Sequence, residues 1–181
     1  MSSVNVVPDS SFYICFLDDI NAPHYLLQLL NARIFKFILG KIIKTEIEKS
    51  PNYKSIEKTI DSRVEIFEYY NYGEILRPFF SLEEIKKGDN EVIVISYVLY
   101  FLNLTFITIL DDTKPRKFLE RNFPELYTRV VGTVGFIEKC SCQYNIFSKE
   151  KGITILNLIK KSKFRIKNEI VNKTIERIGK C

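Results

Sequence analysis

The chain has 181 residues, of which 46% are hydrophobic and 27% are charged, and its formal net charge is +5 at pH 7. These values exclude a disordered protein and predict a single folded domain over residues 1–181. The charge is uneven, because residues 157–181 carry a net charge of +6 and the other residues therefore sum to about −1. A polyanion would be attracted to the C-terminal end, although a solvated helix face carries the same pattern.

The four cysteines are Cys15, Cys140, Cys142 and Cys181. They have neither the paired spacing of a zinc site nor the density of a disulfide framework. The N-terminal segment lacks the basic flank and the cleavage pattern of a signal peptide. We therefore expect reduced thiols and a cytoplasmic protein.

The predicted elements alternate between short β-branched strands and longer helices. In the first half of the chain, the patterns predict a strand at 4–9, a helix at 22–38, a helix that begins after Gly40 and ends before Pro51, and a helix at 54–70. They then predict a helix that begins behind Asp89 and Asn90 and continues to 103, a strand at 104–110 and a helix at 113–122. A short strand at 129–131, a helix after Gly132 and two final helices complete the chain. This alternation implies parallel pairing through right-handed crossovers. It predicts a three-layer α/β/α domain with a central, mostly parallel sheet.

Residues 92–110 form a 19-residue run without a charge, which is close to the length of a membrane span. The run contains Ser96, Asn103, Thr105 and Thr108, and acidic residues flank it at both ends. Its pattern divides at Asn103 into a helix and a β-rich strand. We therefore expect a buried helix and strand, and no membrane association.

Acidic residues follow the predicted strands. Asp9 ends the first strand, and the pair Asp111 and Asp112 ends the strand at 104–110. Glu91 lies in the first turn of the helix before that strand, and Glu46 lies in the helix after the short run of Ile42 and Ile43. Ligands of parallel sheets gather at the carboxyl ends of the strands, so we expect these acids to reach one edge. Carboxylates that share an edge repel one another unless a cation lies among them. Oxygen ligands without His or Cys favour Mg²⁺ or Mn²⁺, which can activate a water and bind a phosphodiester.

Each acid also has a purely structural interpretation. Asp112 or Thr113 could cap the helix at 113–122, Asp89 could cap the helix that follows it, and Glu46 could be a surface charge. These alternatives remain open at the level of sequence.

Two other classes of site have less support. The one histidine, His24, lies away from the predicted strand ends and is expected at the surface or at a helix start, so the Ser-His-Asp and Cys-His mechanisms have little support. A phospho-acceptor receiver domain would place its acid pair after the first strand, whereas here the pair follows a late strand.

Six motifs occur in order along essentially the whole chain: VVPDSS, KTEIEK, KGDNEVIVIS, ILDDTKPRKF, VVGTVGFIEKC and KFRIKNEIV. Their order resembles the PIN-domain nucleases, specifically the small prokaryotic PIN-like proteins with a GTxG turn. The resemblance implies a PIN-like fold and a ribonuclease that depends on Mg²⁺ or Mn²⁺. It also implies the toxin half of a toxin–antitoxin pair, with an antitoxin protein as partner, and a homodimer.

The resemblance also assigns roles to individual residues. The catalytic acids fall on Asp9, Glu46, Glu91, Asp111 and Asp112, and all of these except Glu46 would be metal ligands. Ser10 would hold the first acid in place, Thr133 would lie near the same edge, and Arg116 would contact phosphate. The positive C-terminal end separately suggests Lys160, Lys161, Lys163 and Arg165 as nucleic-acid contacts. The chain departs from the family pattern at Asp89, where Glu is common, at Val92, where a small residue is usual, and at Glu48, which competes with Glu46. Residues 52–86 match poorly and are predicted to be a variable insertion.

In a second hypothesis, the chain has the same fold and the same acidic residues but does not cleave RNA. In this hypothesis the chain is a catalytically silent PIN-fold module that binds RNA or a partner protein. Tight, salt-sensitive RNA binding that survives both chelation and the loss of Asp9 would support it.

Overall fold

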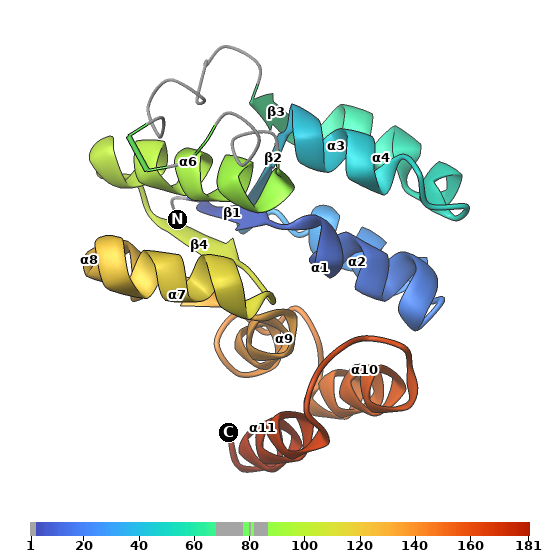
Figure 1. Cartoon of the computed structure of the whole chain (residues 1–181). Helices are drawn as coiled ribbons and strands as arrows, with labels where there is room; N and C mark the ends of the chain where they lie inside the picture. The colour runs from blue at the N-terminus through green and yellow to red at the C-terminus, as the bar shows by residue number, and fades with distance from the viewer. Residues whose placement is uncertain (1–2, 68–77, 80, 82–86) are drawn as a thin grey trace.

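A computed structural model describes residues 3–67, 78–79, 81 and 87–181. Five strands form a parallel sheet in the order β3-β2-β1-β4-β5 (Figure 1). The strands are β1 (Val4–Pro8), β2 (Phe35–Gly40), β3 (Glu65–Phe67), β4 (Phe106–Ile109) and β5 (Val130–Val131). Strand β1 is central, since Val6 pairs with Phe37 on one side and with Ile107 on the other.

Helices lie on both sides of this sheet (Figure 1). In chain order they are α1 (Ser10–Ile14), the π-helical turn η1 (Cys15–Asp19), α2 (Pro23–Leu30), α3 (Lys41–Ile47), the 3₁₀ turn η2 (Tyr53–Ser55), α4 (Glu57–Arg63), α6 (Gly88–Phe101), α7 (Thr113–Asn122), α8 (Pro124–Tyr127), α9 (Thr133–Cys142), α10 (Lys149–Lys161) and α11 (Asn168–Lys180). Helix α6 packs on β1, β2 and β4, and helices α9, α10 and α11 pack against one another. The predicted α/β class, with helices on both faces of a parallel sheet, is confirmed.

The uncharged run at 92–110 forms a helix and a strand, as predicted. Helix α6 ends at Phe101, Asn103 adopts a left-handed backbone conformation with φ of 54°, and the Leu104 N–H returns to the Leu99 carbonyl at 3.0 Å. All four residues of β4 are buried, which is typical of a parallel strand covered on both faces. In the described part of the chain, no helix is long and apolar enough to cross a membrane.

Two helices predicted from the sequence are shorter than expected. The predicted helix at 22–38 ends at Leu30, and Phe35 begins strand β2 instead. The predicted helix at 54–70 likewise ends at Arg63, before β3. A fully buried parallel strand is apolar on both faces, so its pattern resembles a buried helix until pairing with neighbouring strands decides the outcome.

The predicted insertion at 52–86 contains η2, α4 and β3, and β3 forms one edge of the sheet. The remainder of that prediction falls on 68–77, 80 and 82–86, which lie outside the described residues.

The expectation of four reduced thiols is wrong for two of them. Cys142, at the end of α9, forms a disulfide with Cys181, which follows α11. Cys15 and Cys140 are free and buried. The two bonded cysteines are 39 positions apart, so their pairing depends on how α9 packs against α11 and not on local spacing.

We expect reduction of this disulfide to lower the free energy of unfolding by about 3–4 kcal/mol, because the bond restricts a long loop of the unfolded chain. Urea unfolding with and without dithiothreitol measures the difference. A Cys181→Ser variant should match the reduced protein and should be insensitive to dithiothreitol. Equal stability of the oxidised and reduced wild-type protein would contradict the expectation.

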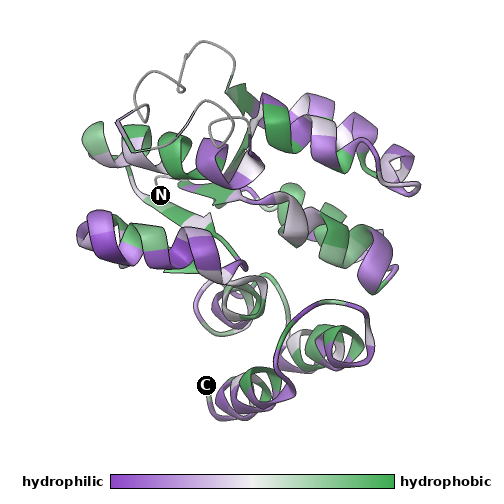
Figure 2. Ribbon diagram, viewed as in Figure 1, coloured by the Kyte–Doolittle hydropathy of each residue, from purple (hydrophilic) through white to green (hydrophobic). Residues whose placement is uncertain are grey.

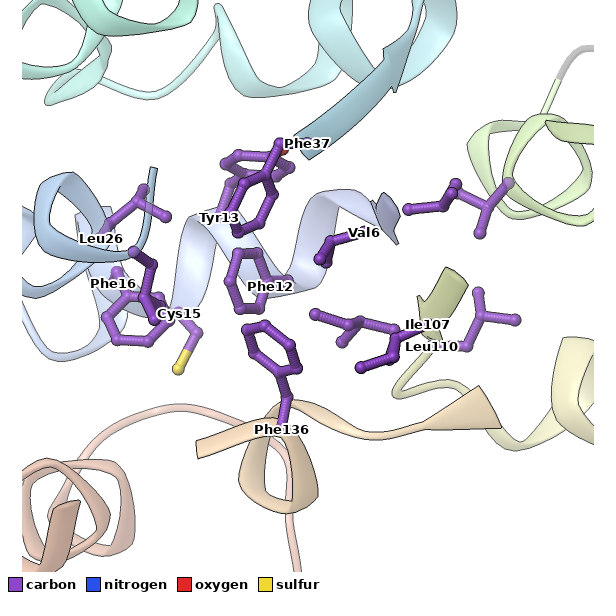
Figure 3. Packing of buried hydrophobic residues seen from close by; sticks show 14 of the residues in the cluster. Val6, Phe12, Tyr13, Cys15, Phe16, Leu26, Phe37, Ile107, Leu110 and Phe136 are labelled. Atoms are coloured by element: carbon purple, nitrogen blue, oxygen red, sulfur yellow. The ribbon is translucent and has the colours of Figure 1, made fainter. Parts of the chain in front are cut away.

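Aromatic rings at the end of β1 connect the first helix to the last third of the chain. The ring of Phe12 on α1 lies between Phe37 of β2 and Phe136 of α9, with centroids 6.2 Å and 5.8 Å away (Figure 3). All three side chains belong to the hydrophobic core, and Figure 2 shows the apolar strands beside helices that carry both apolar and polar segments. This packing fixes α1 and α9 relative to each other, and both helices begin at the carboxyl edge of the sheet.

Candidate functional site

Asp9 and Asp111 lie side by side at the carboxyl ends of the neighbouring strands β1 and β4. The Asp111 backbone N–H donates to Asp9 Oδ2 at 3.0 Å, and the Asp9 N–H donates to the Ile109 carbonyl at 2.9 Å. From β1, the chain adds β2 and β3 on one side of the sheet and then β4 and β5 on the other side. Ligands of open parallel sheets bind at such a change of side, which here lies between β1 and β4. The structure thus brings together the first and last acids of the predicted set.

Asp9 is almost fully buried, with 1% of the residue's surface exposed. Its Oδ1 accepts the Phe12 N–H at 3.0 Å, so the side chain caps α1. Burial, followed by the negative charge of Asp111, raises the pKa of Asp9 to about 8, although the two backbone donors act in the opposite direction. Asp9 is therefore a carboxyl group that a nearby cation would ionise.

The Asp111 side chain points towards the start of α9. Its Oδ1 accepts the Thr133 N–H at 2.9 Å, and its Oδ2 accepts the Thr133 hydroxyl at 2.5 Å. A Cβ on Gly132 would lie 2.9 Å from Asp111 Oδ1, so the glycine permits this approach. Burial raises the pKa of Asp111, while the Thr133 hydrogen bonds and the Arg116 charge oppose that rise. Thr133 therefore lies at the predicted edge and holds Asp111 in position.

The neighbouring Asp112 belongs to a second part of the site. It precedes α7, makes no side-chain hydrogen bond that caps this helix, and is exposed. Its charge and that of Glu46 raise the pKa of Asp89, which burial already raises, to about 6. The charges of Asp112 and Glu46 therefore act on Asp89. The charge of Asp89 in turn contributes to the raised pKa of Asp9.

Sequence reasoning did not include Asp89 among the site residues. Asp89 is the second residue of α6, and Glu91 follows two positions later. Two positions correspond to about 200° around a helix, so the two side chains leave α6 on different sides. From this spacing, the sequence could have indicated that only one of Asp89 and Glu91 faces the carboxyl edge of the sheet.

Glu91 is fully buried, with 0% of its surface exposed, and it caps α3. Its Oε1 accepts the Ile42 N–H at 3.0 Å, and its Oε2 accepts the Ile43 N–H at 2.8 Å. A Cβ on Gly40 would overlap the Glu91 carboxylate, so only glycine fits at the end of β2. This position gives Glu91 a structural function at the start of α3, whereas its predicted role as a metal ligand stays a prediction.

In the part of the chain that the structure describes, hollows adjoin the acids. The first, of about 360 Å³, is lined by Ser10, Ser11, Ile14, Asp19, Asp111, Asp112, Lys163, Phe164 and Arg165. A second, of about 290 Å³, lies between Asp89 and Asp112 and includes Lys87 and Lys114. A larger groove of about 720 Å³ follows the other side of Asp111, along Arg116, Gly132 and helix α11. Each hollow is lined by both acidic and cationic side chains, which are suited to a metal ion and a phosphate-bearing ligand.

The remaining predicted residues occupy varied positions. Ser10 is the first residue of α1 and lines the first hollow. The Arg116 Nη1 donates to the Leu110 carbonyl at 3.1 Å. Lys160 and Lys161 lie in the last turn of α10, where Lys160 Nζ donates to Asn172 Oδ1 at 2.9 Å.

Two aromatic side chains near the first helices have no assigned role. His24 is exposed at the second position of α2, as predicted for a surface or helix-start residue. In the described residues, the Tyr13 hydroxyl is buried without a hydrogen-bond partner, and the Asp9 charge adds to the burial that raises the pKa of Tyr13.

The acids fit Mg²⁺ or Mn²⁺ by their chemistry, because every donor is an oxygen and the buried carboxyl groups repel one another. Among the described residues, however, no group of three or more His, Cys, Asp or Glu side chains is arranged to hold a metal ion. Asp9 and Asp111 alone are compatible with Mg²⁺, which typically takes one or two carboxylates and completes its coordination with water and substrate phosphate.

Comparisons with protein-family models, with curated proteins and with solved structures found no match to this chain. The functional assignment therefore depends on the residues at the carboxyl edge of the sheet and on their surroundings.

Proposed function

We propose that this chain is a PIN-like ribonuclease that hydrolyses RNA phosphodiester bonds at the carboxyl edge of β1 and β4 and depends on Mg²⁺ or Mn²⁺. The observation that carries this proposal is the contact between the buried Asp9 and the half-buried Asp111, where desolvation raises the pKa of both groups. A cation bound to both carboxyl groups would favour their ionised forms and would offset their mutual repulsion, and it could also contact the substrate.

Asp9 and Asp111 would hold the ion, which when bound supplies positive charge for the phosphate oxygens and lowers the pKa of a water. Phe12 and Thr133 orient these two carboxylates through the hydrogen bonds described above. Asp89, with a pKa raised to about 6 by burial and neighbouring acids, is suited to accept and return a proton near neutral pH.

A specific observation favours the second hypothesis, a silent module that binds RNA or a partner protein. All four carboxylate oxygens of Asp9 and Asp111 already accept hydrogen bonds from the protein. This arrangement stabilises the starts of α1 and α9 whether or not a cation is present.

The two functions predict different results in one assay. For the ribonuclease, we expect cleavage of a labelled oligoribonucleotide in Mn²⁺ or Mg²⁺, none in EDTA, and recovery when excess Mn²⁺ is added. The same cations should raise the melting temperature, because a ligand that binds only the folded state stabilises it. Binding of the oligoribonucleotide without cleavage under every metal condition would instead support the silent module.

The resemblance extends the proposal to a toxin-type role, with an antitoxin protein as partner and a homodimer as the assembled form. Co-purification with the product of a neighbouring reading frame and a measurement of molar mass in solution test these two parts.

A further inference from the structure

The segment between α10 and α11 alternates cationic and apolar side chains. Lys163, Arg165 and Lys167 are exposed, whereas Phe164 and Ile166 are half-buried and pack against the hydrophobic core. The two apolar residues therefore anchor the segment, and the three cations between them are presented to solvent.

Local hydrogen bonds also hold this segment in one conformation. The Ser162 hydroxyl donates to the Ile159 carbonyl at 2.8 Å and accepts the Phe164 N–H at 3.1 Å. The Ile166 N–H then donates to the Phe164 carbonyl at 2.9 Å. The cations are thus attached to an ordered backbone, which lowers the entropy cost of binding a ligand.

The three cations differ from two cations of α11 in forming no ion pair among the described residues, although the Lys163 charge acts on Asp19, which lines the same hollow. On α11, Arg177 forms two hydrogen bonds of 2.7 Å with Glu138, and Lys173 pairs with Glu169 at 2.8 Å. Within the described ranges, neither Lys163, Arg165 nor Lys167 has a carboxylate at ion-pair distance. Their charge therefore remains available for an anion that comes from outside the protein.

The segment also lies where two hollows meet the acids. Arg165 and Asp111 line both the first hollow and the larger groove. Lys163 and Phe164 line the first hollow together with Ser10, and Lys167 lines the groove. The two hollows therefore adjoin at Arg165 and Asp111.

We propose that Lys163, Arg165 and Lys167 form a phosphate clamp, in which a nucleic-acid strand runs from the first hollow into the larger groove across Asp111. The clamp binds phosphates by charge and needs no metal ion. The choice of RNA as the strand rests on the proposed function, but the clamp itself is separable from cleavage.

The composition of the hollow favours a nucleic acid over an acidic protein segment. Phe164 and Ile14 supply an apolar wall beside the cations, and bases stack on aromatic side chains while their phosphates contact Lys and Arg. A polyglutamate peptide has no ring that can stack on Phe164, so it would use the charge alone. The clamp should therefore distinguish the two kinds of polyanion.

The test is binding of a fluorescein-labelled oligouridylate to the full chain in EDTA, over a range of KCl concentrations. A triple variant with Lys163→Ala, Arg165→Ala and Lys167→Ala should bind more weakly. The slope of log K against log [KCl] should become shallower by about 2, because each phosphate neutralised on a single strand contributes about 0.7. Because EDTA prevents metal-dependent cleavage, this result does not depend on whether the chain is a nuclease.

The matched control removes two lysines and one arginine elsewhere, with Lys54→Ala, Lys58→Ala and Arg63→Ala on η2 and α4, which are also exposed. It should retain wild-type affinity and slope. An equal loss in both triple variants would overturn the clamp, because it would show a nonspecific effect of net charge. Failure of the wild-type protein to bind the oligouridylate would also overturn the clamp. So would a polyglutamate peptide that binds as tightly as the oligouridylate and loses that binding in the Lys163→Ala, Arg165→Ala, Lys167→Ala variant.

Discussion

Replacing Asp9 with asparagine should reduce RNA cleavage by at least about 100-fold while the protein stays folded. Asparagine keeps the size of the side chain but carries no charge, so it cannot bind a cation as the carboxylate does. Initial rates in Mn²⁺ measure the loss, and circular dichroism measures folding. An Asp61→Asn variant is the matched control, because Asp61 lies on α4 with a side chain that is 60% exposed. Wild-type rates in Asp9→Asn would contradict the proposed ribonuclease.

The same variant should also change how stability depends on pH. The pKa of Asp9 is about 8 in the folded chain and 3.8 in its ordinary state, so between these values the folded state holds a proton that the unfolded state has released. The contribution of Asp9 to stability is therefore fully present below about pH 4 and is lost as the pH rises towards 8.

Over that window, the stability of Asp9→Asn relative to wild type should rise with pH, by on the order of 1 kcal/mol per pH unit at most. Urea unfolding in EDTA at several pH values measures this difference. Parallel curves for the two proteins would show that Asp9 ionises in the folded state as readily as in the unfolded state.

Replacing Glu91 with glutamine should lower the free energy of unfolding by about 2 kcal/mol, because hydrogen bonds to a charged group contribute about that much. The amide keeps one acceptor oxygen, and its NH₂ group would face either the Ile42 or the Ile43 N–H. Cleavage by the variant should stay within a few-fold of wild type at temperatures where it is folded. Urea unfolding and initial rates together test this prediction.

Glu46→Gln is the matched comparison for Glu91→Gln. Glu46 is half-buried and its charge acts on Asp89, so its replacement should leave stability nearly unchanged and lower the pKa of Asp89. If Glu91→Gln instead abolished cleavage without loss of stability, Glu91 would be a metal ligand, as the resemblance implies.

The candidate site was partly predictable because acids that end buried strands must lie at the carboxyl edge of a parallel sheet. Asp9 and Asp111 satisfy that rule, and the structure places them in contact through a backbone hydrogen bond. Asp89 was missed because a helix N-terminus offers a sufficient local explanation for an acid. Only its electrostatic coupling to Asp112, Glu46 and Asp9 distinguishes it.

Strand β2 and the disulfide were not predictable for a related reason. Phe35 and its neighbours are apolar in a pattern that suits a buried helix or a buried strand, and pairing with β1 decided between them. Cys142 and Cys181 meet because α9 and α11 pack together, although a long stretch of chain separates them.

The sequence by itself determined the α/β alternation, the acids at the strand ends and the positive C-terminal segment. These features depend on periodicity and composition over a few neighbouring residues. The tertiary structure decided which partner each carboxylate meets. Asp111 binds Thr133, 22 positions away, and Glu91 binds Ile43, 48 positions away. Such partners are set by how distant helices pack on the sheet, and local sequence does not encode that packing.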